Sequence, residues 1–198
     1  MPITQDDIFR HFEKHEGAIA HMYLDTVGKV TIGIGFMIPD PQSVLVYRLI
    51  NRASGAAATS QEKLADWTRV SQQVKGKIAG SYRRFTTLDM PVDEIKRVLD
   101  SKLRAFAESL RTQFAAFDSF PAEAQLALLD MIFNLGPNGL FRGFPKLCAA
   151  ARRQDWAVCA AESKRLGISP DRNDDTRNQF LAAVTAPAPQ RMTMRRIR

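Results

Sequence analysis

The chain has 198 residues, of which 45% are hydrophobic and 25% are charged, proportions that are ordinary for a folded globular protein. It contains no apolar run of the roughly eighteen residues that a membrane-spanning helix needs, so we expect no stable insertion into a membrane. The formal net charge of +7 favours a polyanionic partner, and a bacterial cell wall meets that requirement as well as nucleic acid does.

The first predicted element is a helix over residues 4–15. Its start resembles a capping box, formed by Thr4 and Asp7, and apolar residues follow at helical spacing. Gly17 is well placed to end the helix and leaves Glu16 in its last turn. The residues before it lack the basic region and apolar core of a secretory signal, so we expect synthesis in the cytoplasm without one.

A glycine-rich β-hairpin is predicted next. Residues 30–36 alternate between large apolar side chains and the small residues Thr31, Gly33 and Gly35, which is typical of a half-buried strand. Residues 22–25 suit a preceding strand, and residues 26–29 suit a turn in which Gly28 supplies a positive φ. The hairpin would place Tyr23 and Asp25 on one face, beside Thr31 and above the two glycines, where a bulky ligand has room.

Two carboxylates, Glu16 and Asp25, belong to this stretch of the chain. A pair of carboxylates that flanks a cleft is the minimum equipment for hydrolysing a glycosidic bond, because one protonates the leaving oxygen while the other activates water or attacks the sugar. Spacing alone is equally compatible with two solvated surface acids.

The segment of residues 39–85 is predicted to be a helical insertion. A short helix is expected over residues 44–50, and a longer one is expected to begin at Ser60, with Trp67, Val74 and Ile78 on its apolar stripe. A tryptophan here would suit stacking on a sugar ring, but its place on the stripe favours packing in the core.

From Pro91 onward the pattern is purely helical. An amphipathic helix is expected over residues 92–110, and residues 122–135 are apolar nearly all round, which indicates a helix buried on every side. Asn134, at the end of this run, is a candidate for substrate contact or for a structural hydrogen bond. A last helix from about Asp174 should present Phe180, Leu181 and Val184 to the core. We therefore expect a mainly α (α+β) fold.

No metal or cofactor site is predicted. The two cysteines, Cys148 and Cys159, fall on apolar helix faces and suit free buried thiols better than a disulfide, and the three histidines are not spaced as ligands. Residues 186–198 are expected to form a flexible basic tail, which suits either adhesion to anionic surfaces or plain solvation.

The glycine-rich stretch carries a family resemblance. Glu16-Gly17, followed by the pattern Tyr-x-Asp-Thr-x-Gly-x-x-Thr-Ile-Gly-Ile-Gly over residues 23–35, resembles the active-site signature of phage-type lysozymes, glycoside hydrolase family 24. Residues 130–139 resemble the long buried helix of that family, and residues 169–172 resemble its Asn-Arg segment. The resemblance implies one catalytic domain over residues 1–185, with a small β-hairpin lobe (about 16–85) joined to a larger helical lobe (about 86–185) on which the first helix packs.

The resemblance also implies a set of site residues. Glu16 would be the general acid, Asp25 and Thr31 would hold the attacking water in an inverting reaction, and Arg172 would pair with Glu16. Tyr23, Gly35, Phe36 and Asn134 would bind substrate or support the site. Phe36 stands where the family usually has His, which removes a polar partner of the second carboxylate, so we expect lower activity or an altered pH range. Asp171 stands where Asn is usual, a milder departure.

The function that the resemblance implies is muramidase activity: hydrolysis of the β-1,4 bond between N-acetylmuramic acid and N-acetylglucosamine in peptidoglycan. The alternative is a catalytically weak or inactive peptidoglycan-binding module. A bacteriolytic enzyme of this kind would act as a monomer in the periplasm or wall of the target bacterium, as a phage endolysin or a secreted antibacterial effector. A holin, a secretion machinery or an immunity protein would then be its protein partner, and no nucleic acid is expected to bind.

Overall fold

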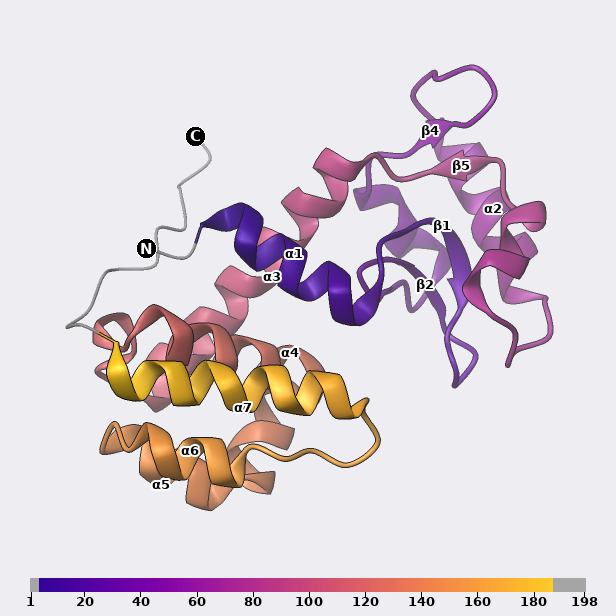
Figure 1. Ribbon diagram of the computed structural model, residues 1–198. Helices are drawn as coiled ribbons and strands as arrows, with labels where there is room; N and C mark the ends of the chain where they lie inside the picture. The colour runs from indigo at the N-terminus through magenta and orange to yellow at the C-terminus, as the bar shows by residue number, and fades with distance from the viewer. Residues whose placement is uncertain (1–3, 187–198) are drawn as a thin grey trace. The chain divides into compact units, whose positions relative to one another are not determined.

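The computed structural model describes residues 4–186 (Figure 1). Helices dominate these residues, and the strands form one three-stranded and one two-stranded antiparallel sheet, which confirms a mainly α fold with a small β component. None of the described helices is both long enough and apolar enough to cross a membrane. The predicted basic tail lies outside the described residues except for Ala186.

The described residues divide into two compact units. One, the hairpin unit, comprises residues 12–100 and contains every described strand. The other, the helical unit, comprises residues 4–11 and 101–186. Its boundary with the hairpin unit falls within α1 (Gln5–Glu16) and within α3 (Val92–Gln113), whereas the sequence suggested boundaries at about residues 16 and 85.

The helix α1 begins and ends as its sequence predicts. The backbone N–H of Asp7 donates to Thr4 Oγ1 at 3.1 Å, and the backbone N–H of Thr4 donates to Asp7 Oδ2 at 2.9 Å, so the capping box is present. Gly17 follows the last helical residue with φ +71° and donates its N–H to Glu13 O at 2.9 Å. Glycine adopts this left-handed conformation without steric cost, which ends the helix at Glu16.

The larger sheet has the strand order β1 (Ile19–Leu24), β2 (Val30–Gly33), β3 (Phe36–Met37). The turn between β1 and β2 contains Gly28 at φ +89°, as predicted. The single strand predicted over residues 30–36 is wrong, because Gly33 and Gly35 both adopt φ +65° and the chain turns between them. All four residues of β2 are buried, so the predicted half-exposed face does not exist.

The insertion after β3 is less helical than expected. It consists of two 3-10 helices, one α-helix and a pair of short strands: η1 (Pro41–Val46), β4 (Ile50–Asn51), α2 (Ser60–Ser71), η2 (Ala79–Phe85) and β5 (Leu88–Asp89). The helix predicted over residues 44–50 is therefore wrong beyond Val46. The helix that begins at Ser60 ends at Ser71, which leaves Val74 and Ile78 69% and 82% exposed instead of on a buried stripe.

A buried carboxylate fixes α2 in the hairpin unit. Asp66 is fully buried and accepts hydrogen bonds from the backbone N–H groups of Thr87 at 2.9 Å and Leu88 at 3.0 Å, and it pairs with Arg69. Trp67 is partly buried, and its indole N–H donates to Ile38 O at 3.2 Å. These bonds join α2 to the backbone at β5 and to the residue that follows β3.

The helical unit surrounds one fully buried helical segment. After the second part of α3 come η3 (Phe117–Ser119), α4 (Ala122–Gly143), α5 (Pro145–Arg152), α6 (Trp156–Glu162) and α7 (Pro170–Thr185). Residues 124–132 of α4 are all buried, which confirms the prediction from their continuous apolar pattern. Gly136 interrupts α4 with non-helical φ 69° and ψ 168°, directly before Pro137. Both α4 and α6 pack against α7 (Figure 1).

Two predictions for the helical unit were inaccurate at its C-terminal end. The last helix begins at Pro170 rather than near Asp174, because Ser169 caps it by accepting from the backbone N–H of Arg172 at 3.3 Å. Phe180 is fully buried, but Leu181 and Val184 are 40% and 52% exposed. The two cysteines are free and buried, as expected; burial raises the pKa of Cys148, and raises that of Cys159 to about 12.

Candidate active site

The β1–β2 hairpin places Tyr23 directly opposite Thr31 in its register. Residues that face each other in an antiparallel pair project to the same side of the sheet, so the phenol and the hydroxyl are neighbours. Thr31 is only 3% exposed, and its hydroxyl donates to Lys29 O at 3.1 Å. The oxygen of Thr31 is thereby left to act as an acceptor.

Asp25 is held by the turn that it begins. One oxygen of its carboxylate, Oδ1, accepts from the backbone N–H groups of Val27 at 3.0 Å and Lys29 at 2.7 Å. The other oxygen accepts no hydrogen bond from the part of the chain that the structure describes. Since Lys29 donates its N–H to Asp25 and accepts the hydroxyl of Thr31 at its C=O, one residue's peptide groups link the two polar side chains.

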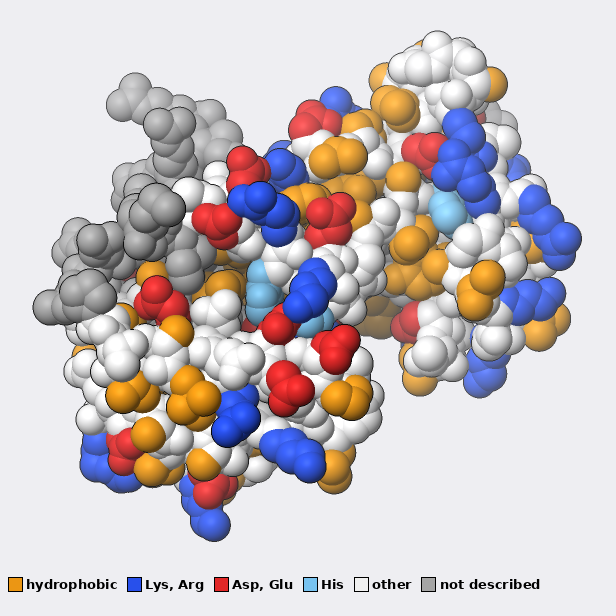
Figure 2. All heavy atoms as spheres, in the orientation of Figure 1, with side chains coloured by type: hydrophobic (Ala, Val, Ile, Leu, Met, Phe, Trp, Pro, Cys, Tyr) orange, Lys and Arg blue, Asp and Glu red, His pale blue; other side chains and the backbone are white. Residues whose placement is uncertain are grey.

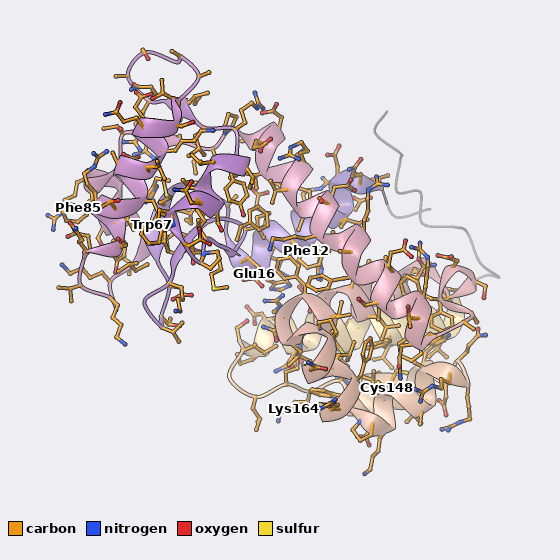
Figure 3. The ribbon with its side chains drawn as sticks, turned by 180° about the vertical axis from the view of Figure 1, so that it is seen from behind. Phe12, Glu16, Trp67, Phe85, Cys148 and Lys164 are labelled. Atoms are coloured by element: carbon orange, nitrogen blue, oxygen red, sulfur yellow. The ribbon has the colours of Figure 1, made fainter. Side chains whose placement is uncertain are left out.

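Glu16 is the last residue of α1 and is partly exposed (Figure 3). Its carboxylate lies over Gly35: a Cβ atom added to this glycine would stand 3.5 Å from Glu16 Oε2. Gly35 is itself exposed. The backbone next to the Glu16 carboxylate is therefore open to a ligand, since no side chain rises from it.

The pKa of Tyr23 is raised by burial and by the two carboxylates. Burial raises the pKa of its phenol first, and the negative charges of Glu16 and Asp25 raise it further, to about 12. The phenol therefore stays protonated at neutral pH and can donate a hydrogen bond.

Phe36, where the resembled family usually has His, is a core residue of the hairpin unit. Its side chain is fully buried, and its ring lies against Gly33: a Cβ atom on Gly33 would stand 2.7 Å from Phe36 Cδ2. The chain can turn sharply between β2 and β3 because Gly33 leaves this space to the ring. An apolar contact therefore occupies the position where the resembled family usually has a polar residue.

Replacing Gly33 with alanine is expected to lower the free energy of unfolding by about 2–4 kcal/mol, because the new Cβ overlaps the Phe36 ring and the φ of +65° is strained for any other residue. Urea denaturation followed by circular dichroism measures the change. Gly80→Ala is the matched control, since a Cβ there meets no atom within 4 Å, and it should change stability by less than about 0.5 kcal/mol. Equal stability of the two variants would contradict the packing described for Phe36.

Arg172 and Asn134 belong to the helical unit. Arg172 is 5% exposed, and its Nη2 donates to Asp130 Oδ1 at 2.9 Å. Asn134 is exposed on α4. The expected pairing of Arg172 with Glu16 remains a prediction.

Asp130 is a residue that sequence reasoning missed as a structural centre. It is fully buried, and its Oδ2 accepts from Arg165 Nη2 at 2.7 Å and from the hydroxyl of Thr176 at 2.9 Å, while His11 Nε2 lies 3.4 Å from Oδ1. Burial alone would raise its pKa, but the hydrogen bond from His11 and the charges of Arg172 and Arg165 outweigh burial and hold the pKa well below its usual range. The signal in the sequence was Asp130 itself, an acid with apolar residues on both sides within the run of residues 122–135.

The hairpin unit therefore brings together two carboxylates, a phenol, a buried hydroxyl and an exposed glycine. This set supplies a proton donor, a proton acceptor and two groups that can orient a water molecule or a sugar. Within residues 4–186, no three His, Cys, Asp or Glu side chains are grouped so that they could hold a metal ion. In comparisons with known proteins, no family model and no curated protein matches the chain.

Proposed function

We propose that the protein is a muramidase, which hydrolyses the β-1,4 bond between N-acetylmuramic acid and N-acetylglucosamine in peptidoglycan. The observation that carries the proposal is the geometry at the hairpin: the Glu16 carboxylate lies over Gly35, and the Asp25 and Thr31 side chains are both hydrogen-bonded to Lys29. Residues 16–35 also resemble the active-site signature of phage-type lysozymes. The net charge of +7 suits a wall that carries peptide carboxylates and anionic polymers.

In this mechanism Glu16 is the general acid. Its proton passes to the glycosidic oxygen as the bond to the anomeric carbon breaks, which makes the sugar a better leaving group. The bare backbone at Gly35 leaves room for a sugar ring beside the carboxylate. The protonated phenol of Tyr23 can donate a hydrogen bond to the sugar or to either carboxylate.

Asp25 and Thr31 hold the attacking water. One oxygen of Asp25 is occupied by two backbone N–H groups, and the hydroxyl proton of Thr31 is donated to Lys29 O, so each side chain offers an oxygen that can accept a proton of the same water. Such a water directs a lone pair at the anomeric carbon and gives up its proton to Asp25. A water between carboxylate and sugar favours inversion, which requires the two carboxyl groups to be about 6.5–9.5 Å apart.

Digestion of purified peptidoglycan tests this proposal. We expect the wild-type chain to reduce the turbidity of a peptidoglycan suspension and to release fragments whose masses match reducing N-acetylmuramic acid ends. Fragments with anhydro-muramic ends would indicate a lytic transglycosylase and overturn the hydrolytic mechanism. Sedimentation with the wall without any lysis would favour the alternative, an inactive binding module in which Phe36 has replaced a needed polar group.

Delivery to the wall is part of the same proposal. The enzyme would act in the periplasm or wall of a target bacterium, either as a phage endolysin or as a secreted antibacterial effector. A neighbouring holin gene would favour the first role, and a neighbouring immunity gene would favour the second. Salt-sensitive binding to DNA without wall lysis would instead support a nucleic-acid binder.

A further inference from the structure

Among the exposed aliphatic side chains of the hairpin unit, one lies in the β1–β2 turn and two lie in the loop between α2 and η2. Val27, in the β1–β2 turn, is 68% exposed, and Val74 and Ile78, in the loop between α2 and η2, are 69% and 82% exposed. Single exposed aliphatic residues are ordinary in soluble proteins. Several that share one surface require an explanation, because they mark sites that bind another molecule.

The turn and the loop lie side by side. A Cβ atom on Gly28 would stand 3.2 Å from Lys75 Cδ, so Lys75 packs its aliphatic stem against the β1–β2 turn. The two segments occupy the same end of the hairpin unit (Figure 1). Residues 74–78 are all exposed. Val27 therefore shares a surface with Val74 and Ile78, although the chain separates them widely.

Lysines are interspersed with these aliphatic residues. Lys29, Lys75 and Lys77 are exposed, and none of them forms an ion pair with a carboxylate of residues 4–186. The segments 26–29 and 72–78 contain no acidic residue. Figure 2 shows Lys and Arg side chains separated by hydrophobic ones over this unit. We call the six residues the lysine–aliphatic patch; its members are Val27, Lys29, Val74, Lys75, Lys77 and Ile78.

We propose that the lysine–aliphatic patch docks the protein on a bilayer of anionic phospholipid. Lysines at a membrane surface are attracted by the negative headgroups, and each contributes a factor of about five to the binding constant. Transfer of exposed valine and isoleucine side chains from water to the boundary between headgroups and acyl chains is favourable, so it strengthens binding. A soluble polyanion would engage the lysines but would leave the aliphatic side chains in water. The combination of both therefore favours a lipid surface.

Vesicle co-sedimentation of the full chain tests the proposal. Vesicles of phosphatidylcholine alone are compared with vesicles that also contain phosphatidylglycerol, and binding is expected only to the second. The variant K75Q/K77Q should bind these anionic vesicles about twenty-five-fold more weakly. The variant V74S/I78S should bind them about tenfold more weakly, although it keeps every charge.

Lys164→Gln is the control, since Lys164 is an exposed lysine of the helical unit; its binding should match the wild type. Circular dichroism checks that the variants remain folded, which we expect because all four substituted side chains are in an exposed loop. Unchanged binding by both patch variants would assign the binding to other basic residues and overturn the proposal. Loss of binding in K75Q/K77Q but not in V74S/I78S would also overturn it, by showing that charge alone is recognised.

Discussion

Replacing Glu16 with glutamine is expected to lower the rate of peptidoglycan lysis by about 10²- to 10⁴-fold while the fold is retained. The amide has the shape of a protonated carboxyl group but cannot give up a proton to the glycosidic oxygen. Glu16 is partly exposed and lies over the bare backbone of Gly35, and glutamine has nearly the same size and shape, so we expect the fold to be retained. Turbidity of a peptidoglycan suspension measures the rate, and circular dichroism measures the fold.

Glu13→Gln is the matched control for this experiment. Glu13 lies one turn earlier on α1 and is exposed, and its backbone carbonyl, which the substitution does not change, accepts the N–H of Gly17. Its variant makes the same chemical change on the same helix and should lyse the wall at the wild-type rate. Undiminished lysis by Glu16→Gln would remove Glu16 from the mechanism, whereas equal losses in both variants would indicate a general effect on α1.

The hairpin shows what a local pattern can and cannot predict. Gly17 was expected to end the first helix and Gly28 to adopt positive φ in a turn; both expectations are confirmed, and both residues have positive φ. Gly33 and Gly35 were assigned to a strand because they alternate with apolar residues, yet both adopt positive φ and turn the chain. Alternation does not reveal the backbone conformation of a glycine, because glycine adopts positive φ about as readily as negative φ. The contact between Gly33 and the Phe36 ring, which leaves no room for a side chain at residue 33, is formed only in the folded chain.

The insertion shows how periodicity fails at a helix end. Val74 and Ile78 continue the three- and four-residue spacing of α2, but the helix ends at Ser71 and Gly76 adopts φ +83° in the loop that follows. Spacing predicts which side chains would share a face if the helix continued. It does not predict where the helix ends. The same two residues, exposed instead of buried, are two of the three aliphatic members of the lysine–aliphatic patch.

The residues around Asp130 show the limit set by distance along the chain. The apolar run of residues 122–135 correctly indicated burial. It did not indicate that Arg165 and Thr176, 35 and 46 residues further on, would contact Asp130. A buried charge demands a partner, so its presence was the available signal, but the identity of the partners depends on how α4 packs against α7.

Replacing Asp130 with asparagine is expected to lower the free energy of unfolding by about 3–5 kcal/mol. Both carboxylate oxygens accept hydrogen bonds: Oδ1 accepts from Arg172, and Oδ2 accepts from Arg165 and from the hydroxyl of Thr176. An amide presents only one oxygen, so its NH₂ group must face donors on one side, and both buried guanidinium groups lose the negative charge that they contact. Urea denaturation measures the change, with Asp174→Asn as a control at an exposed position of α7.

The dependence of this effect on pH separates charge from packing. The pKa of Asp130 is held below its usual range by the hydrogen bond from His11 and the two arginines, which outweigh its burial, whereas the unfolded chain titrates near the ordinary value of about 3.9. As pH falls through that value, the unfolded chain takes up a proton that the folded chain does not, so the stabilisation by Asp130 is fully present above pH 4 and diminishes below it. Other acids titrate equally in wild type and variant, so the stability difference between the two isolates Asp130. We expect this difference to shrink from pH 4 to 2; a difference that persists unchanged at pH 2 would show that the asparagine is destabilising through its shape rather than through the lost charge.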